Sequence, residues 1–296
     1  MKKLFWVGVI LSFMVVALGP TASQALNSGA HIYVVDQVFP FALDKIDLYY
    51  GSIAPDIPLY ASPEGYWPNG FCETHYKYIK LPYTWWNLPQ KAFAKGWQTH
   101  NEIWGADSFA HGTCGDYVCC IKKECNYLSG YVNQQAGFLA SQFPDILNEE
   151  AGFALAHFAV EVAIDLLLIT ENYDPYLGQK LLGAALLRSP ADFDLLVKVF
   201  VSSGRTDLPT LTAAESTFRD LVIKYGTALT LPEPLRMGVL SQLGVQIAQA
   251  MGVVEIDSSQ VKEILNAAID LCKDTDYYGI IDQAVESIRH KPGLIR

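Results

Sequence analysis

The sequence predicts an all-α fold, a multi-helical bundle with long structured loops, and three observations support it. Several segments carry apolar residues at three-to-four spacing, helix start and stop residues flank some of them, and two-residue alternation is scarce. The expected helices span residues 150–170, 177–187, 213–225, 236–251 and 259–272.

Local signals mark some of the expected helix ends. Asp257 and the two serines after it are N-cap candidates for the last helix, and Gly226 and Gly252 are candidate stop signals. Residues 52–90 are rich in Pro, Tyr, Trp and Gly, which favours long structured loops there.

The first 25 residues are expected to form a signal peptide. Lys2 and Lys3 precede an apolar run over residues 4–18, and Ser23-Gln24-Ala25 supplies small residues for a cleavage site. Cleavage after Ala25 would begin the mature chain at Leu26 and place it outside the cell or in the periplasm. No transmembrane segment is expected in the mature chain, because acidic residues and a histidine interrupt its most apolar stretch, 152–169.

The mature chain is divided into a metal-binding helical core, 26–188, and C-terminal packing helices, 189–296. The sequence leaves open whether these form one domain. A net charge of −10 argues against nucleic acid held on a basic surface, so no stable nucleic-acid complex is expected.

Six cysteines in an exported chain predict disulfides that hold the loops around the histidines. Thiolate metal binding is the alternative, and the sequence does not reveal the connectivity. The cysteines lie at positions 72, 114, 119, 120, 125 and 272.

Five of the six histidines occur where carboxylates are within reach, which predicts a site for divalent ions, with zinc the default. The strongest pair is His157 and Glu161, which lie one turn apart on an otherwise apolar helix. A buried histidine bonded to a glutamate is the structural alternative. Burial of Glu161 and Asp165 in so apolar a helix is costly without a partner, and Asp165 is a candidate outer-shell residue.

A second segment places three ligand-type residues on one stripe. Asp107 and His111 repeat the four-residue spacing, and His100 precedes Asp107 by seven residues. Gly112 would let the chain leave the helix.

A third segment, 51–56, is expected to be an extended or turning loop with Asp56 at its tip, because a proline follows Ala54. An ordinary Pro-Asp turn is the alternative. His31, alone, would carry no prediction.

Four segments together resemble the zinc-dependent phospholipase C family. They are Ala30-His31-Ile32-Tyr33-Val34, Tyr50-Gly51-Ser52-Ile53-Ala54-Pro55-Asp56, Gly96-Trp97-Gln98-Thr99-His100 and Ala106-Asp107-Ser108-Phe109-Ala110-His111-Gly112. The resemblance covers roughly residues 26–170. It implies a mostly helical fold, related to the zinc-dependent single-strand nucleases, with a cluster of up to three zinc ions.

The resemblance implies three zinc positions. Asp56, His75, His100 and Asp107 would hold one, and His111, His157 and Glu161 a second. The amine and carbonyl of Leu26 would hold the third with His31 and a bridging Asp107, which would give signal cleavage a catalytic purpose.

The chain departs from the family pattern in two places. Six residues separate His100 from Asp107 where the family has three, so close coordination requires a bulge or break near Gly105. Otherwise Glu102 or another group would have to substitute. The mature chain would also begin with Leu26 where the family has tryptophan.

The implied activity is secreted, zinc-dependent phosphodiester hydrolysis of a phospholipid or other phosphoester, with transient contact to a membrane surface. Asp56 is the candidate for orienting or deprotonating water. The candidate substrate-binding residues are Tyr66, Trp67, Phe71 and Tyr76, with Tyr60, Trp85 and Trp86 as further aromatic candidates. Plain packing is the alternative for these aromatics, and a nuclease or phosphatase, or a non-catalytic metal-binding relative, for the whole chain.

Overall fold

The computed structural model describes residues 28–61, 67–112, 130–147, 150–250, 252–253 and 255–295, and this part of the chain is helical, without β-strands. The elements from the N-terminal half are α1 (Ser28–Val38), α2 (Lys45–Ile53), η1 (Ala54–Tyr60), α3 (Gly70–Cys72), η2 (Glu73–Lys77), α4 (Leu88–His100), α5 (Ala106–His111), α6 (Tyr131–Gln142) and α7 (Pro144–Leu147). Those that follow are α8 (Glu150–Thr170), α9 (Leu177–Leu187), α10 (Pro190–Leu196), η4 (Val197–Val201), α11 (Leu208–Thr230), α12 (Leu235–Ala250), α13 (Ser258–Lys273) and α14 (Tyr277–Arg289). The all-α prediction is confirmed.

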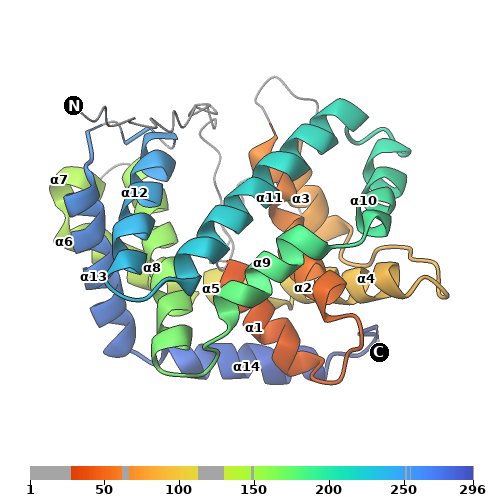
Figure 1. Cartoon of the computed structure of the whole chain (residues 1–296), viewed down its shortest axis with the longest axis horizontal. Helices are drawn as coiled ribbons and strands as arrows, with labels where there is room; N and C mark the ends of the chain where they lie inside the picture. The colour runs from red at the N-terminus through yellow and green to blue at the C-terminus, as the bar shows by residue number, and fades with distance from the viewer. Residues whose placement is uncertain are drawn as a thin grey trace, which may run out of the picture.

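Helix α8 lies among other helices, beside α12 and α6 in Figure 1, and its apolar composition follows from that position. It packs against α6 and α13 and touches α1, α9 and α12. Its length and hydropathy would suit a membrane span, yet 78% of its most apolar 18-residue window is buried inside the fold. A helix covered on most sides by other helices needs apolar residues around its circumference.

The expected helices are found, although the one expected at 213–225 begins earlier and ends later than predicted. The two helices predicted at 150–170 and 177–187 have those bounds, and Asp257 forms a capping box with Gln260 at the start of α13. Gly226 does not end a helix, because α11 continues to Thr230. A Cβ atom on Gly226 would lie 3.1 Å from the Leu181 side chain, so this glycine lets α11 and α9 pack closely.

The segment expected to present Asp56 on an extended or turning loop is instead the 3₁₀-helix η1. Ala54 has right-handed helical angles (φ −65°, ψ −22°) even though Pro55 follows it. The proline occupies the first turn of η1, where its missing N–H costs no hydrogen bond. Asp56 is therefore held on a short helix that packs against α11.

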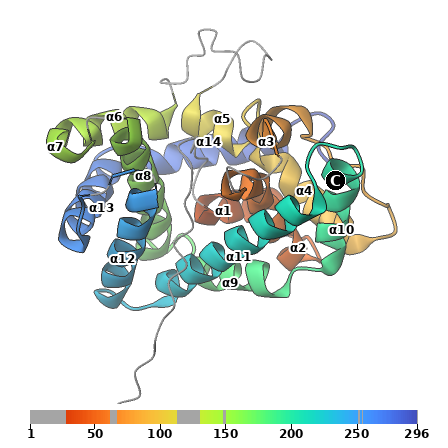
Figure 2. The same ribbon diagram turned by 90° about the horizontal axis from the view of Figure 1, so that it is seen from above.

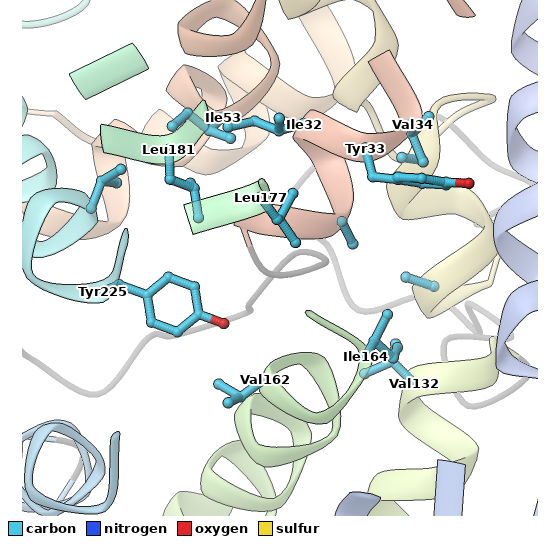
Figure 3. Close-up of a cluster of buried hydrophobic side chains, with 14 of the residues drawn as sticks. Ile32, Tyr33, Val34, Ile53, Val132, Val162, Ile164, Leu177, Leu181 and Tyr225 are labelled. Carbon is cyan, nitrogen blue, oxygen red and sulfur yellow. The ribbon is translucent and has the colours of Figure 1, made fainter. Parts of the chain in front are cut away.

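The C-terminal helices pack directly on the elements that carry the candidate ligands. Helix α11 lies against α9 and η1, α13 against α8 and α6, and α14 against α1 and α5. Figure 2 shows α14 running beside α5 and α1. Core side chains from both halves meet in Figure 3, where Ile32 and Val34 of α1 lie in one apolar cluster with Leu181 and Tyr225.

Of the six cysteines, two lie in the described part of the chain. Cys72 is disulfide-bonded, whereas Cys272 has a free, buried thiol. The remaining four lie outside the described residues, so the expectation that they form disulfides around the histidines stays a prediction.

Candidate metal centre

Four buried side chains converge on one point from four elements and form the first group of candidate ligands. The Nε2 atoms of His75 and His100 lie 3.1 Å apart. Asp56 Oδ1 lies 3.3 Å and 3.5 Å from these two nitrogens, and Asp107 Oδ2 lies 3.6 Å and 3.0 Å from them. Zinc–nitrogen bonds of 2.0–2.1 Å in a tetrahedron imply ligand–ligand distances of about 3.3 Å. These five of the six distances between the four atoms are therefore close to the spacing of ligands around one zinc ion.

Backbone carbonyls fix which nitrogen of each histidine faces this point. His100 Nδ1 lies 2.7 Å from the Ser52 carbonyl, and His75 Nδ1 lies 3.0 Å from the Phe71 carbonyl. A carbonyl only accepts hydrogen bonds, so both Nδ1 atoms donate. In the neutral rings the Nε2 lone pairs then face one another and the two carboxylates, which is the arrangement of metal-binding histidines.

Helix α4, which carries His100, meets α2 through glycines at their contact. A Cβ atom on Gly51 would lie 2.1 Å from the Phe93 carbonyl oxygen, and one on Gly96 would lie 2.0 Å from that of Leu48. Only glycine permits this approach of α2 to α4. The close contact brings the Ser52 carbonyl within hydrogen-bond distance of His100.

The six residues between His100 and Asp107 do not separate these ligands, because the helix breaks as the spacing requires. Helix α4 ends at His100 and α5 begins at Ala106. Asn101 Oδ1 accepts hydrogen bonds from the N–H groups of Ile103, Trp104 and Gly105 at 3.0–3.2 Å. A Cβ atom on Gly105 would lie 2.5 Å from the Thr99 carbonyl oxygen, so the tight turn needs glycine. The expected break near Gly105 is confirmed.

His111, His157 and Glu161 form a second group of candidate ligands. His157 Nε2 lies 2.9 Å from Glu161 Oε1, which confirms that this pair converges across one turn of α8. His111 Nε2, from α5, lies 3.9 Å from the same oxygen. The ligand atoms of the three residues lie within 4.8 Å of one another, close enough to hold one ion.

Two residues that the sequence did not single out as supports orient the histidines of the second group. Glu102 Oε1 accepts from His111 Nδ1 at 2.7 Å. Asn133 Nδ2 donates to the His111 carbonyl at 3.2 Å, which turns Asn133 Oδ1 towards His157 Nδ1, 2.8 Å away. Both contacts leave the Nε2 atoms directed at Glu161. Glu102 is thus placed behind His111, although it also lies within reach of Asp107.

Asp107 lies between His31 and the two histidines of the first group. Its Oδ2 atom faces His100 and His75, while Oδ1 lies 3.0 Å from His31 Nε2. The His31 ring stacks on the His100 ring with a centroid distance of 3.9 Å. Neither His31 nitrogen and neither Asp107 oxygen makes a hydrogen bond within the described part of the chain. Buried polar atoms of this kind are costly unless a cation or another group satisfies them.

Burial and opposite charge compete in setting the protonation of the first group. Burial alone would lower the pKa of His100, but the Asp107 and Asp56 carboxylates outweigh burial and raise that pKa well above its usual value. Burial would raise the pKa of Asp107, yet His100 and His31 hold it well below the usual range. Without a cation, a proton on His100 thus offsets part of the charge of the buried carboxylates, whereas burial and the nearby His100 lower the pKa of His31.

Asp165 supports the start of the helix that carries His31, and within the described residues no hydrogen bond or ion pair joins it to a candidate ligand. Its Oδ2 atom accepts from the Gly29 N–H at 3.0 Å and from the Tyr225 hydroxyl at 2.9 Å. Burial raises the pKa of Asp165 to about 7, and the hydrogen bonds from Tyr225 and Gly29 limit the rise. The residue expected in an outer shell therefore positions α1.

The candidate substrate aromatics occupy several environments. Trp67 is buried against Phe200, Phe71 stacks on the His75 ring at 3.8 Å, and Tyr76 meets Phe71 edge-on. Tyr60 packs on Phe218, whereas Trp85 and Trp86 are exposed at the start of α4. Leu26 and Tyr66 lie outside the described residues, so their roles stay predictions.

Comparison with protein-family models, curated proteins and solved structures finds no match to this chain. The chemistry of the site is therefore argued from its own geometry and donor set.

The donor set fits zinc. Imidazole nitrogens and carboxylate oxygens in buried groups of three or four suit zinc among the common divalent ions, since calcium and magnesium prefer oxygen ligands alone. Within the described residues, all eight side-chain ligands expected from the sequence lie in this site. Seven of them form the two groups, and the eighth, His31, lies beside Asp107.

Proposed function

We propose that this chain is a zinc-dependent phosphodiester hydrolase of the phospholipase C type. The position of Asp107 carries the proposal, because its two oxygens face His31 on one side and His75 and His100 on the other. A carboxylate that faces two ligand groups favours metal ions a few ångströms apart, as phosphoester hydrolases with several metal ions use. The order of ligand types along the chain, which resembles the zinc phospholipases C, supports the same class.

Zinc in these groups would supply positive charge for the phosphoryl oxygens and lower the pKa of a water molecule. The protein's own contribution is to hold the ligands in place and to exclude bulk water from around them. Five of the ligands are fully buried, namely Asp107, His75, His100, His111 and Glu161. A backbone carbonyl or a buried side chain orients each of four histidines, His75, His100, His111 and His157. A site fixed in this way needs little reorganisation during the reaction.

Asp56 is the proposed proton acceptor for the attacking water. It is the most exposed of the ligand carboxylates, at 8%. Burial would raise its pKa, but His100 and His75 outweigh burial and hold that pKa below its usual value. The carboxylate is therefore ionised at neutral pH, so it can accept a hydrogen bond from the attacking water and orient it.

The test compares two substrates with the zinc-loaded protein. Hydrolysis of a chromogenic phosphocholine ester, with little cleavage of single-stranded DNA, is expected for a phospholipase C. Preferred DNA cleavage would indicate the nuclease alternative, and loss of both activities despite full zinc loading would favour a non-catalytic metal-binding protein. The variant Asp56→Asn tests the proposed role of Asp56. Its matched control is Asp270→Asn, which changes an exposed carboxylate on α13.

A further inference from the structure

The last helix and the segment after it lie against every element that carries a ligand of the His31–His100–Asp107 group. Helix α14 packs on α1, which carries His31, and on α5, which carries Asp107 (Figure 2). At its end, Arg289 Nη2 donates to the Gln37 carbonyl of α1 at 3.0 Å. The following residues, 291–295, return to the end of α4 that carries His100.

The contact with α4 is made by one buried glutamine. Gln98 Nε2 donates to the Gly293 carbonyl at 3.2 Å, and Gln98 Oε1 accepts from the Ile295 N–H at 3.0 Å. The Gln98 side chain is fully buried and lies two residues before His100. Both ends of its amide therefore bind a segment 195 or more residues away in sequence.

A second contact lies within the turn between the ligands. Lys291 Nζ sits 5.3 Å from the centre of the Trp104 ring, a cation–π distance. Between Gln98 and Trp104 lies Asn101, whose Nδ2 donates to the Gln98 carbonyl at 2.9 Å. Residues 291–295 thus contact the chain both before the turn that joins His100 to Asp107, at Gln98, and within it, at Trp104.

We propose that α14 and residues 291–295 act as a brace that sets the position of His100 relative to Asp107 and His31, with Gln98 as the positioning residue. The inference rests on the proposed metal function only for its consequence, tighter zinc binding. Helical hydrogen bonds fix ligands that share one helix, but His100 and Asp107 lie on two helices joined by a turn. Their spacing therefore depends on contacts from outside the turn, and the brace provides them.

The first test measures zinc affinity in Gln98 variants of the full chain. Stepwise removal of zinc by a competing chelator should show that Gln98→Ala loosens binding at the His100 and Asp107 ligands by about 10–100-fold, the usual effect of residues that orient ligands. Gln98→Glu keeps the acceptor for the Ile295 N–H and should fall between Gln98→Ala and the parent. Gln242→Ala, an exposed helical glutamine on α12, is the control.

The second test removes residues 292–296 and leaves Gln98 in place. Hydrogen exchange of the metal-free protein should then speed up at the N–H groups of Ile103, Trp104 and Gly105, which Asn101 protects. Exchange within α12 should stay unchanged. This readout needs neither zinc nor activity.

The outcomes separate the two proposals. Unchanged zinc affinity together with unchanged exchange in the turn would overturn the brace. An equal loss of zinc from the His111–His157–Glu161 group would also overturn it, because that pattern indicates general destabilisation. A parent protein that binds no zinc would refute the proposed function, while the exchange experiment would still decide whether the brace orders the turn.

Discussion

Replacing Asp165 with asparagine should change the pH dependence of stability in a defined direction. The carboxyl group is fully buried, and burial raises its pKa to about 7 from its usual value of 3.8. The folded state therefore binds more protons than the unfolded state between about pH 4 and pH 7. Its contribution to stability is complete below pH 4 and is lost as pH rises through 7.

The size of this effect follows from the pKa difference. A rise of roughly three units at about 1.4 kcal/mol per unit gives about 4 kcal/mol of stability lost across this range, as an upper estimate. Asparagine keeps an oxygen that accepts from the Gly29 N–H and the Tyr225 hydroxyl, and it carries no charge at any pH. Asp165→Asn should therefore become more stable relative to the parent as pH rises from 4 to 8.

Urea unfolding of the zinc-saturated parent and variant at several pH values measures this difference. Subtracting the two curves removes groups that titrate equally in both proteins. Parallel curves would refute the reasoning and would mean that Asp165 stays ionised inside the fold.

Three further predictions concern the ligands and their supports. Neighbouring carboxylates outweigh burial and raise the pKa values of His100 and His111, so zinc binding at pH 7 should release protons. The heat of binding should then depend on the ionisation enthalpy of the buffer, and a heat that is the same in all buffers would contradict this prediction. Asn133→Ala should weaken zinc binding about 10–100-fold by freeing the His157 ring, whereas Asn266→Ala on the exposed side of α13 should not, as chelator competition would show. Gly105→Ala should cost about 1–3 kcal/mol in unfolding free energy, because its Cβ atom would lie 2.5 Å from the Thr99 oxygen. Gly137→Ala on α6, where nothing lies within 4 Å, should instead be neutral or stabilising in the same denaturation experiment.

The sequence predicted the parts of the site that depend on local spacing. His157 and Glu161 lie four residues apart on a regular helix, so their convergence follows from helix geometry alone. The break near Gly105 was also predictable, because one helix could not bring His100 to Asp107. Such relations involve residues within a few turns of each other.

The supports of the ligands were not predictable, because they join distant segments. Asn133 is 24 residues from His157, and Asp165 is 136 residues from Gly29. The sequence around Asn133 and Asp165 contains no pattern that indicates which distant residue each of them contacts. Gly226 was misread for the same reason, since the glycine serves contact with α9 and does not end its own helix.

The C-terminal helices were assigned no chemistry from their sequence, and no ligand is found there in the described residues. Their contribution is through packing, because Tyr225 holds Asp165 and the segment after α14 binds Gln98. A pattern of apolar residues predicts that a helix packs but does not show which helix it packs against.

Zinc content of the mature protein, purified without chelators and measured by elemental mass spectrometry, tests the central claim most directly. The account predicts two to three zinc ions per chain, with one fewer in Glu161→Gln because that substitution removes the carboxylate from the His111–His157–Glu161 group. One zinc ion or none in the parent under zinc-replete conditions would contradict a multinuclear site and, with it, the proposed hydrolase.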